Sequence, residues 1–156
     1  MELPEENVQT YPRPPALEPV PQHVRVMLGD VIVADTRAAL RVLETHHAPT
    51  YYIPPGDVLV PLTPASGASF CEWKGSASYW TVTAGTAVAE AAAWSYANPT
   101  ARFAALKDHL AFYVGKMTAC YVGTERVMPQ PGSFYGGWVT GNLRGQIKGG
   151  PGTRHW

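Results

Sequence analysis

Charged side chains are scarce in this chain of 156 residues, and they balance one another. Only 15% of the residues are charged, against about 25% in an average globular protein. Twelve basic residues stand against twelve acidic ones, so the formal net charge is zero. Nucleic-acid-binding domains usually carry a basic face and a high pI, and proteins that bind membrane surfaces carry polybasic clusters. We therefore expect no nucleic acid and no membrane among the partners of this protein.

Long apolar runs and cysteine pairs are also missing. The most apolar run, Thr86–Trp94, contains Glu90 and is far shorter than the ~18 residues of a membrane-spanning helix. The opening residues, Met-Glu-Leu-Pro-Glu-Glu, provide neither the basic nor the apolar part of a signal peptide. Cys71 and Cys120 are the only two cysteines, which is no disulfide framework. These absences favour a cytoplasmic protein with two reduced thiols.

The sequence also lacks the short motifs of the common cofactor and metal enzymes. It contains no phosphate-binding G-x-x-x-x-G-K-[ST] loop and no dinucleotide-binding G-x-G-x-x-G fingerprint. A G-x-S-x-G nucleophile elbow, a C-x-x-C pair and an H-E-x-x-H zinc motif are absent as well. No two acidic residues form the Asp-x-Asp pair that would hold magnesium for nucleotidyl transfer. We therefore predict no cofactor and no metal site.

Glycine and proline are what the chain has in abundance, with 15 of each. This composition favours turns and short strands over long helices. Residues 1–22 hold six of the prolines and predict an extended, Pro-rich arm, either loosely held or lying on a neighbouring subunit. The remainder, residues 23–156, has the length of one domain.

Residue patterns predict a mainly β fold, a β-rich α+β domain. Runs of β-favouring residues at 23–28 and 31–35, split by Gly29-Asp30, predict a hairpin. A second hairpin is predicted from 70–74 to 76–83, with its bend at or near Gly75. Further strands are expected over these ranges: 51–53, 57–62 (a strand or a sheet edge), 110–122 and 138–139. In total we expect about seven or eight short antiparallel strands in one compact domain with extended N- and C-terminal segments.

Two short helices complete the predicted fold. Thr36 can cap a helix over 37–46, whose two leucines share one face. A second helix is predicted over 103–109. The alanine-rich run 87–94 fits either a helix or a strand, because alanines favour a helix whereas the flanking sequence is β-rich.

Three side chains are candidate reactive groups: Cys71, Lys74 and Glu44. If Cys71 and Lys74 share one turn, the ammonium can lower the pKa of the thiol and make it a nucleophile. The alternative is a buried cysteine beside a lysine whose head reaches solvent. Lys74, which precedes Gly75, can also hold an anionic ligand. Glu44 ends the first predicted helix, where the helix dipole disfavours a carboxylate, so we expect it to face Arg25, Lys74, a ligand or water.

Aromatic side chains with polar ends form the candidate ligand pocket. Such rings can line a pocket for a flat or apolar ligand while their polar ends fix its orientation. The set comprises Tyr51, Tyr52, Tyr79, Trp94, Tyr96 and Tyr113, with Arg25 as a further ligand contact. Ordinary core packing is the alternative for each ring. His46 and His47 are interpreted as surface residues at a helix end, and His109 as a weak acid–base candidate.

Several of these residues recur in the order typical of a known family. The most specific elements are C-x-x-K-G from Cys71 and W-x-Y-x-x-P from Trp94, followed by Phe134–Trp138 and Lys148–Gly152. Over roughly residues 23–156 the chain resembles the bacterial and fungal family known as domain of unknown function 427. The resemblance implies a compact β-rich fold similar to the β-tent of methionine sulfoxide reductase B, without its zinc cysteines. It also brings the family name nucleotidyltransferase-like, for which the paired carboxylates are missing here.

Two functions of different class follow. In the first, the domain binds a small molecule in the aromatic pocket, with Glu44 and Lys74 as charged contacts. Cys71 or a tyrosine can then act on that molecule as acid, base or nucleophile, and whether the protein is an enzyme stays open. In the second, the domain is a non-catalytic interaction module, such as a homodimer that buries an apolar patch.

Overall fold

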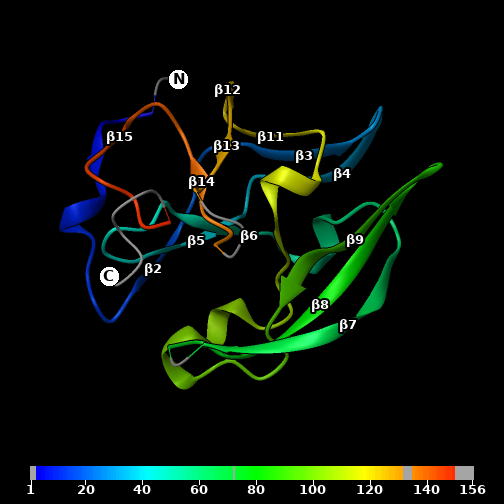
Figure 1. Ribbon diagram of the computed structural model, residues 1–156, viewed down its shortest axis with the longest axis horizontal. Coiled ribbons are helices and arrows are strands. Elements are labelled where there is room, and N and C mark those ends of the chain that lie inside the picture. Colours follow the sequence, from blue (N-terminus) through cyan, green and yellow to red (C-terminus); the bar gives the residue numbers. More distant parts are fainter. Residues whose placement is uncertain (1–2, 72, 132–134, 150–156) are drawn as a thin grey trace.

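A computed structural model describes residues 3–71, 73–131 and 135–149 of the chain. The fold is mainly β: short strands form several small sheets, and every helical element among the described residues is a 3₁₀ turn (Figure 1). The prediction of a mainly β fold is therefore confirmed. The likeness to a β-tent stays a prediction.

One four-stranded antiparallel sheet has the strand order β12-β11-β3-β4. Its strands are β3 (Val24–Leu28), β4 (Val31–Thr36), β11 (Ala119–Val122) and β12 (Glu125–Arg126). Gly29-Asp30 turns the chain between β3 and β4, and Gly29 takes a left-handed φ of +61°, which glycine adopts without steric cost. The first predicted hairpin is thus confirmed.

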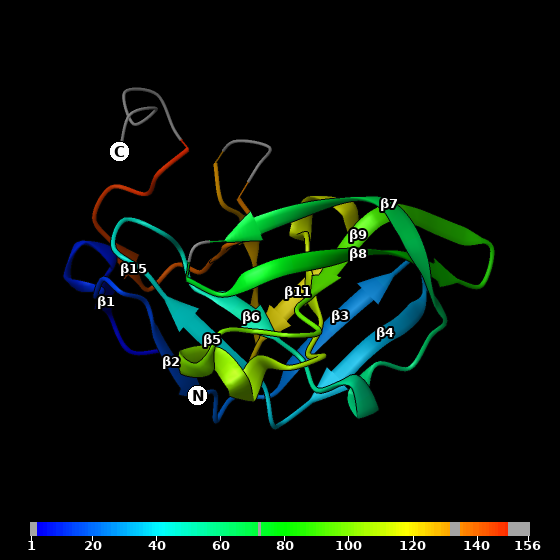
Figure 2. The same ribbon diagram turned by 90° about the horizontal axis from the view of Figure 1, so that it is seen from below.

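The other four-stranded antiparallel sheet has the order β10-β9-β8-β7 and consists mostly of long strands (Figure 2). Its strands are β7 (Leu62–Cys71), β8 (Gly75–Ala84), β9 (Ala87–Ser95) and β10 (Ala111–Phe112). Cys71 pairs with Gly75 at the turn between β7 and β8, so the second predicted hairpin is confirmed. The run 87–94 is a strand rather than a helix, because its backbone pairs with β8 on one side and with β10 on the other.

Smaller sheets complete the described part of the fold. Strands β2 (Ala16–Pro19), β5 (Leu40–Leu43) and β6 (Thr50–Tyr52) form an antiparallel sheet in the order β2-β5-β6. The two-stranded pairs are antiparallel β13 (Met128–Pro129) with β14 (Trp138–Val139), and parallel β1 (Glu6–Asn7) with β15 (Leu143–Arg144). The 3₁₀ turns are η1 (Val8–Thr10), η2 (Pro55–Asp57), η3 (Ala101–Leu106) and η4 (Val114–Lys116).

The prediction of two short helices is wrong. Within 37–46 the chain forms β5, which pairs with β2 on one side and with β6 on the other. Two ladders of backbone hydrogen bonds outweigh the helix propensity of so short a segment, which is marginal by itself. Within 103–109 only the end of η3 is helical; Phe103 has the non-helical angles φ −110° and ψ 22° while its ring is buried. Packing of that ring sets the local backbone.

Two predicted strands are shorter than expected. The segment 110–122 is divided by η4 into β10 and β11, which belong to different sheets. In the segment 57–62, Val58 forms a single bridge with Ala34 before β7 begins. Both segments therefore carry the chain from one sheet to another, which a residue pattern does not reveal.

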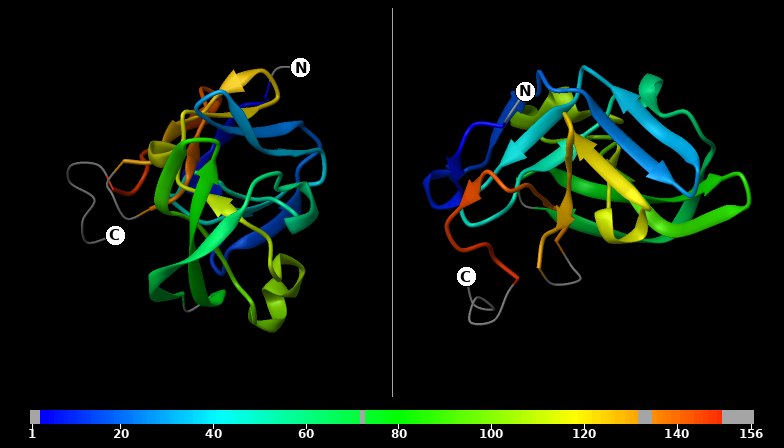
Figure 3. Two further views of the ribbon diagram at one scale, coloured as in Figure 1. Left: turned by 90° about the vertical axis from the view of Figure 1, so that its right-hand side faces the viewer. Right: turned by 90° about the horizontal axis from the view of Figure 1, so that it is seen from above.

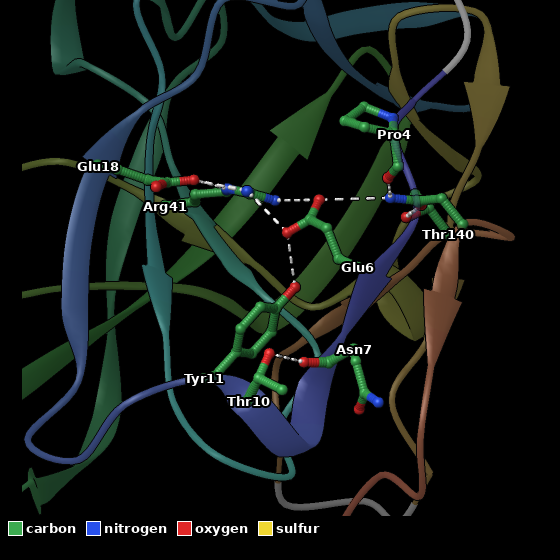
Figure 4. Close-up of polar contacts among 9 residues, drawn as sticks. Pro4, Glu6, Asn7, Thr10, Tyr11, Glu18, Arg41 and Thr140 are labelled. Carbon is green, nitrogen blue, oxygen red and sulfur yellow. Dashed lines mark hydrogen bonds and ion pairs between the residues drawn. The ribbon is translucent and has the colours of Figure 1, made fainter.

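Residues 3–22 pack against the body of the domain, chiefly at β5. Arg41 on β5 joins this segment to the body through two carboxylates (Figure 4): its Nε donates to Glu18 at 2.6 Å, and its terminal nitrogens donate to Glu6 at 2.9 and 3.1 Å. The Tyr11 hydroxyl donates to the same Glu6 carboxylate at 2.8 Å. Val8 and Tyr11 are buried next to Leu43 of β5. An ion-pair network and a small apolar cluster therefore hold the N-terminal segment in place.

The two four-stranded sheets enclose the main hydrophobic core (Figure 3). Val26 of β3 and Val33 of β4 belong to it together with Val82 of β8, and all three are fully buried. Trp138 of β14 is also fully buried, and its ring stacks on Tyr51 with 5.0 Å between centroids. A second buried cluster lies where the β7–β8 turn approaches β5 and β6.

Candidate functional site

A cavity of about 340 Å³ lies beside the second buried cluster, between the β7–β8 turn, β6 and the C-terminal loops. Eight of the residues singled out from the sequence line it: Glu44, Tyr52, Cys71, Lys74, Tyr79, Trp94, Tyr96 and Tyr113. Arg25 does not belong to this group. It lies on β3 in the other sheet, with its guanidinium 5.0 Å from the centroid of the Tyr121 ring. Tyr51 packs in the main core instead.

Tilted and edge-on rings form one wall of the cavity. Tyr79 on β8 and Trp94 on β9 are cross-strand partners. Trp94 lies 4.5 Å from Tyr113 and 6.5 Å from Tyr52 between ring centroids, the latter pair being edge to face. Tyr52 lies 6.4 Å from Tyr96. These distances are those of mutually supporting aromatic pairs, so the wall is rigid.

The hydroxyl groups of Tyr52, Tyr96 and Tyr113 stay protonated at neutral pH. Burial raises the pKa of Tyr52 and the pKa of Tyr96 well above the ordinary value. Burial also raises the pKa of Tyr113, and the neighbouring Tyr79 raises it further. Tyr79 shares a hydrogen bond of 2.7 Å with the Ser69 hydroxyl. The wall therefore offers neutral hydrogen-bonding groups rather than phenolates.

Lys74 is positioned by its backbone and by an aromatic neighbour. The Thr100 amide donates to the Lys74 carbonyl at 3.1 Å, and the Thr100 hydroxyl donates to the Trp73 carbonyl at 2.6 Å. The Lys74 ammonium lies 6.0 Å from the centroid of the Tyr96 ring, a distance at which a cation is attracted to a ring face. The next residue, Gly75, has φ +110°, a conformation that favours glycine.

The opposite rim is polar and is built around His47. Glu44 Oε2 lies 3.6 Å from His47 Nε2 and 3.6 Å from Arg13 Nε. Lys148 also lines the cavity, and its ammonium lies 5.4 Å from the centroid of the Tyr135 ring. Sequence reasoning placed His47 on the surface because it read the preceding residues as a helix. In the structure β5 ends at Leu43, and the chain then turns the His47 ring into the cavity.

Gln130 connects the segments that form this rim, and sequence reasoning missed it. It is only 2% exposed. Its Oε1 accepts from the Ala48 amide at 3.2 Å, while its Nε2 donates to the Lys148 carbonyl at 2.9 Å and to His47 Nδ1 at 3.4 Å. Because Nδ1 accepts, the neutral His47 ring carries its proton on Nε2, which faces Glu44. No sequence pattern distinguishes this glutamine from one on the surface.

Gly136 and Gly137 bring the C-terminal loop against the cavity. A Cβ at position 136 would overlap the ring carbons of Trp94, and a Cβ at position 137 would overlap Gln130 Oε1 and the Ala48 carbonyl. The backbone amide of Gln130 also donates to the Gly137 carbonyl at 3.0 Å. The backbone approaches the Trp94 ring at Gly136 and the Gln130 and Ala48 oxygens at Gly137, and each approach requires glycine.

The environment of His47 is electropositive. Burial lowers the pKa of His47 to about 4, and Lys148, Arg13 and Lys74 contribute to this decrease through their charges. Glu44 Oε2 lies 3.6 Å from both His47 Nε2 and Arg13 Nε, so its charge is shared between the two. Positive charge therefore converges on the cavity from both of its rims.

This shift predicts a loss of stability in acid. Between pH 7 and pH 5 we expect the free energy of unfolding to fall by about 2 kcal/mol on account of His47. The unfolded imidazole, with a pKa of ~6.5, takes up a proton in that range, whereas the folded one stays neutral until the pH approaches about 4. The contribution of neutral His47 to the free energy of unfolding is thus complete above pH ~6.5 and is lost as the pH falls through the folded pKa.

Urea unfolding at both pH values measures this effect. The His47→Gln variant should lose that part of the pH dependence, whereas a control variant, His109→Gln, should keep it. An unchanged pH dependence in His47→Gln would show that the folded pKa of His47 is ordinary.

The two cysteines lie in different surroundings. Cys71 is partly exposed and lines the cavity. Cys120 is fully buried in the main core, and burial raises the pKa of its thiol to about 12, so that it is unreactive at neutral pH. Across the described residues, no three side chains of the histidine, cysteine, aspartate or glutamate type gather as metal ligands. None of the described helical elements is long and apolar enough to cross a membrane.

Comparison with known proteins identifies a family. No curated protein matches the chain. A family match covers residues 16–123, which include the aromatic wall, Cys71 and Lys74 but not the C-terminal rim from Gln130 to Lys148. Of the C-terminal motifs, Phe134 and residues 150–152 lie outside the described residues. Since the match spans more than half of the sequence, the chain belongs to the family described as domain of unknown function DUF427.

Proposed function

We propose that the cavity binds a small organic anion with a flat or apolar body. The observation that carries the proposal is the convergence of two lysines on an aromatic wall. Among the described residues, neither Lys74 nor Lys148 has a carboxylate within ion-pair distance. Both nevertheless lie close enough to His47 to lower its pKa. Two ammonium groups that have no carboxylate partner among the described residues, beside an aromatic wall, favour an anionic ligand.

The aromatic wall and the polar groups suit different parts of such a ligand. Trp94 and Tyr113 offer faces for a ring or another apolar body. A carboxylate or phosphate group would lie between the two lysines. Glu44, the one acidic residue among the described lining residues, is suited to accept a hydrogen bond from the ligand. In this proposal Glu44 and Lys74 contact different groups of the ligand rather than each other.

Glu44, Lys74 and Cys71 are the groups we propose as reactive if the bound molecule is also converted. Glu44 would act as a base, Lys74 would stabilise negative charge, and Cys71 would act as a nucleophile. Once a converted ligand is known, Glu44→Gln should retain binding and lose turnover. Turnover that survives in this variant would remove Glu44 from the catalytic role.

Isothermal titration calorimetry with matched probes tests the proposed binding. Benzoate and phenylphosphonate should bind, whereas the neutral benzyl alcohol and the cationic benzylamine should not. Lys74→Met and Lys148→Met should each weaken binding of the anions by about tenfold, the loss of one charged contact. The control variant is Lys107→Met, because Lys107 is exposed and does not line the cavity. Equal affinity for all four probes, or no binding at all, would contradict the proposal.

Cysteine alkylation gives the same test a second readout. In the folded protein iodoacetamide should modify Cys71 and leave the fully buried Cys120 intact. A bound anion should slow the modification of Cys71. Because Cys120 becomes reactive only when the chain unfolds, it reports within each sample whether the fold is intact.

Exposed apolar side chains favour the second candidate, an interaction module that forms a homodimer. Large apolar residues with exposed side chains are Ile32, Leu59, Phe70, Val88 and Met128. Phe70 is the most exposed of them, at 74%, and lies at the rim of the cavity. Light scattering measures the mass in solution. A dimer that Phe70→Ser converts to a monomer, together with no binding of any anion, would favour this candidate.

A further inference from the structure

A second cavity, of about 410 Å³, adjoins the first. The two share a boundary of six residues: Tyr79, Tyr113, Gln130, Tyr135, Gly136 and Gly137. The two cavities therefore lie side by side across three tyrosines, and the second one reaches the middle of the β7-β8-β9 sheet. The proposed anion site occupies only the first of them.

The second cavity is lined mainly by small and apolar residues. Away from the shared boundary its lining includes Gly67, Ala68, Ala91, Val114 and Pro129. No acidic side chain is among the described lining residues. This composition contrasts with that of the first cavity, where Glu44, Lys74 and Lys148 stand around the rim.

Among the described residues, Lys116 is the one charged residue that lines the second cavity, and its ammonium already has hydrogen-bond partners. The Lys116 ammonium donates to the Glu90 carbonyl at 3.0 Å and to the Ala91 carbonyl at 3.4 Å. It also lies 5.7 Å from the centroid of the Tyr113 ring. Lys116 therefore presents its aliphatic stem, while its charge is directed to the backbone.

Irregularities in two strands create this second cavity. The pairing of β7 with β8 shifts between Pro64 and Ala68, and that of β8 with β9 shifts between Trp80 and Val82. Next to the second shift Ala91 takes a φ of +47°, which is uncommon for a residue other than glycine. Bulges of this kind locally interrupt the ladder and turn the strand. Both bulges contribute lining residues, so the opening is built into the sheet.

We infer that the ligand is an elongated amphipathic anion, whose apolar tail occupies the second cavity while its anionic head lies between Lys74 and Lys148. This inference rests on the proposed function and extends it to a ligand class. The charged side chains Glu44, Lys74 and Lys148 line the first cavity, whereas the second is lined, away from the boundary, mostly by small uncharged residues. A ligand with one charged end and one apolar end matches that division, whereas a compact anion leaves the second cavity empty.

A series of para-alkyl benzoates tests the inference without any variant. Calorimetry compares benzoate with 4-ethyl-, 4-butyl- and 4-hexylbenzoate on the wild-type protein. Affinity should rise by up to about fourfold for each methylene that is buried, and should level off once the tail fills the cavity. If benzoate binds and the longer homologues bind no better, the ligand does not extend into the second cavity and the inference is overturned. If benzoate itself does not bind, the proposed anion site is contradicted, and the inference falls with it.

A pair of matched variants locates the tail. Gly115 lines the second cavity only, and a Cβ added there meets no atom within 4 Å, so Gly115→Phe should fold and fill the space. The control is Gly56→Phe, at a position with equally open surroundings that lines neither cavity. Gly115→Phe should keep the benzoate affinity and abolish the gain of 4-hexylbenzoate, whereas Gly56→Phe should retain both. A gain that survives in Gly115→Phe would place the tail elsewhere.

Discussion

Replacing Trp138 by alanine is expected to lower the free energy of unfolding by about 4 kcal/mol. The Trp138 side chain is fully buried, and its ring stacks on Tyr51. Its Nε1 donates to the Phe112 carbonyl at 3.0 Å, and that hydrogen bond is buried. The substitution therefore leaves a large cavity and a buried carbonyl without its donor. Because Trp138 ties β14 to β10 and β6, we expect the whole fold rather than one loop to weaken.

Urea denaturation followed by circular dichroism measures this loss. Trp138→Phe is the informative companion, because it keeps an aromatic ring against Tyr51 and removes only the hydrogen bond and part of the volume. We expect it to cost roughly half as much as the alanine substitution. A loss below about 2 kcal/mol for Trp138→Ala would mean that the surrounding core can collapse around the missing ring.

Replacing Arg41 by methionine is expected to cost about 3 kcal/mol. Arg41 and Glu6 are mostly buried, with side chains 16% and 18% exposed. Methionine would keep much of the packing of the stem, but it would leave the Glu6 carboxylate without its cation, and the Tyr11 hydroxyl that still donates to it carries no charge. Removing one partner of a buried ion pair is costly because the remaining charge is still partly desolvated. Glu18 is more exposed and contributes less.

An exposed ion pair in the same region provides the control. Arg144 lies 3.5 Å from Glu5, and both side chains are largely exposed. Arg144→Met should change stability by less than ~0.5 kcal/mol. Hydrogen exchange adds a local readout: in Arg41→Met the amides of β2 should exchange faster than those of β8. Equal losses for the two arginine variants would show that the Glu6 network contributes nothing beyond its surface charges.

Sequence patterns correctly predicted the parts of the fold that depend on residues close together in the chain. The β3–β4 hairpin followed from two β-favouring runs around Gly29-Asp30, whose conformation depends on residues next to each other in the sequence. The spacing of leucines in β5 fits a helix equally well, and only its pairing with β2 and β6 makes it a strand. The pairing of β5 with β2 and β6 joins separate segments of the chain, which the spacing of leucines within β5 does not relate to one another.

The residues of the candidate site likewise fall into two groups, those that could be identified from the sequence and those that could not. Cys71 and Lys74 are close in the sequence, and the tyrosines and Trp94 were selected by their chemistry, so these residues could be singled out without a structure. The rim residues His47, Gln130 and Lys148 could not. Gln130 binds the imidazole of a residue 83 positions earlier, and its role exists only once those segments meet. Arg25 shows the converse, because its chemistry suited a ligand while its strand lies in the other sheet.

The parallel pairing of β1 with β15 has a consequence for the way the protein is made. Glu6 pairs with Leu143, so the first described strand waits for nearly the whole chain to leave the ribosome. At roughly 5–20 residues per second, that interval lasts about seven to thirty seconds. Gln130 and Lys148 are also synthesised late, after the aromatic wall. We therefore expect a nascent chain to expose its rings before the polar rim exists, and to be most prone to aggregation in this interval.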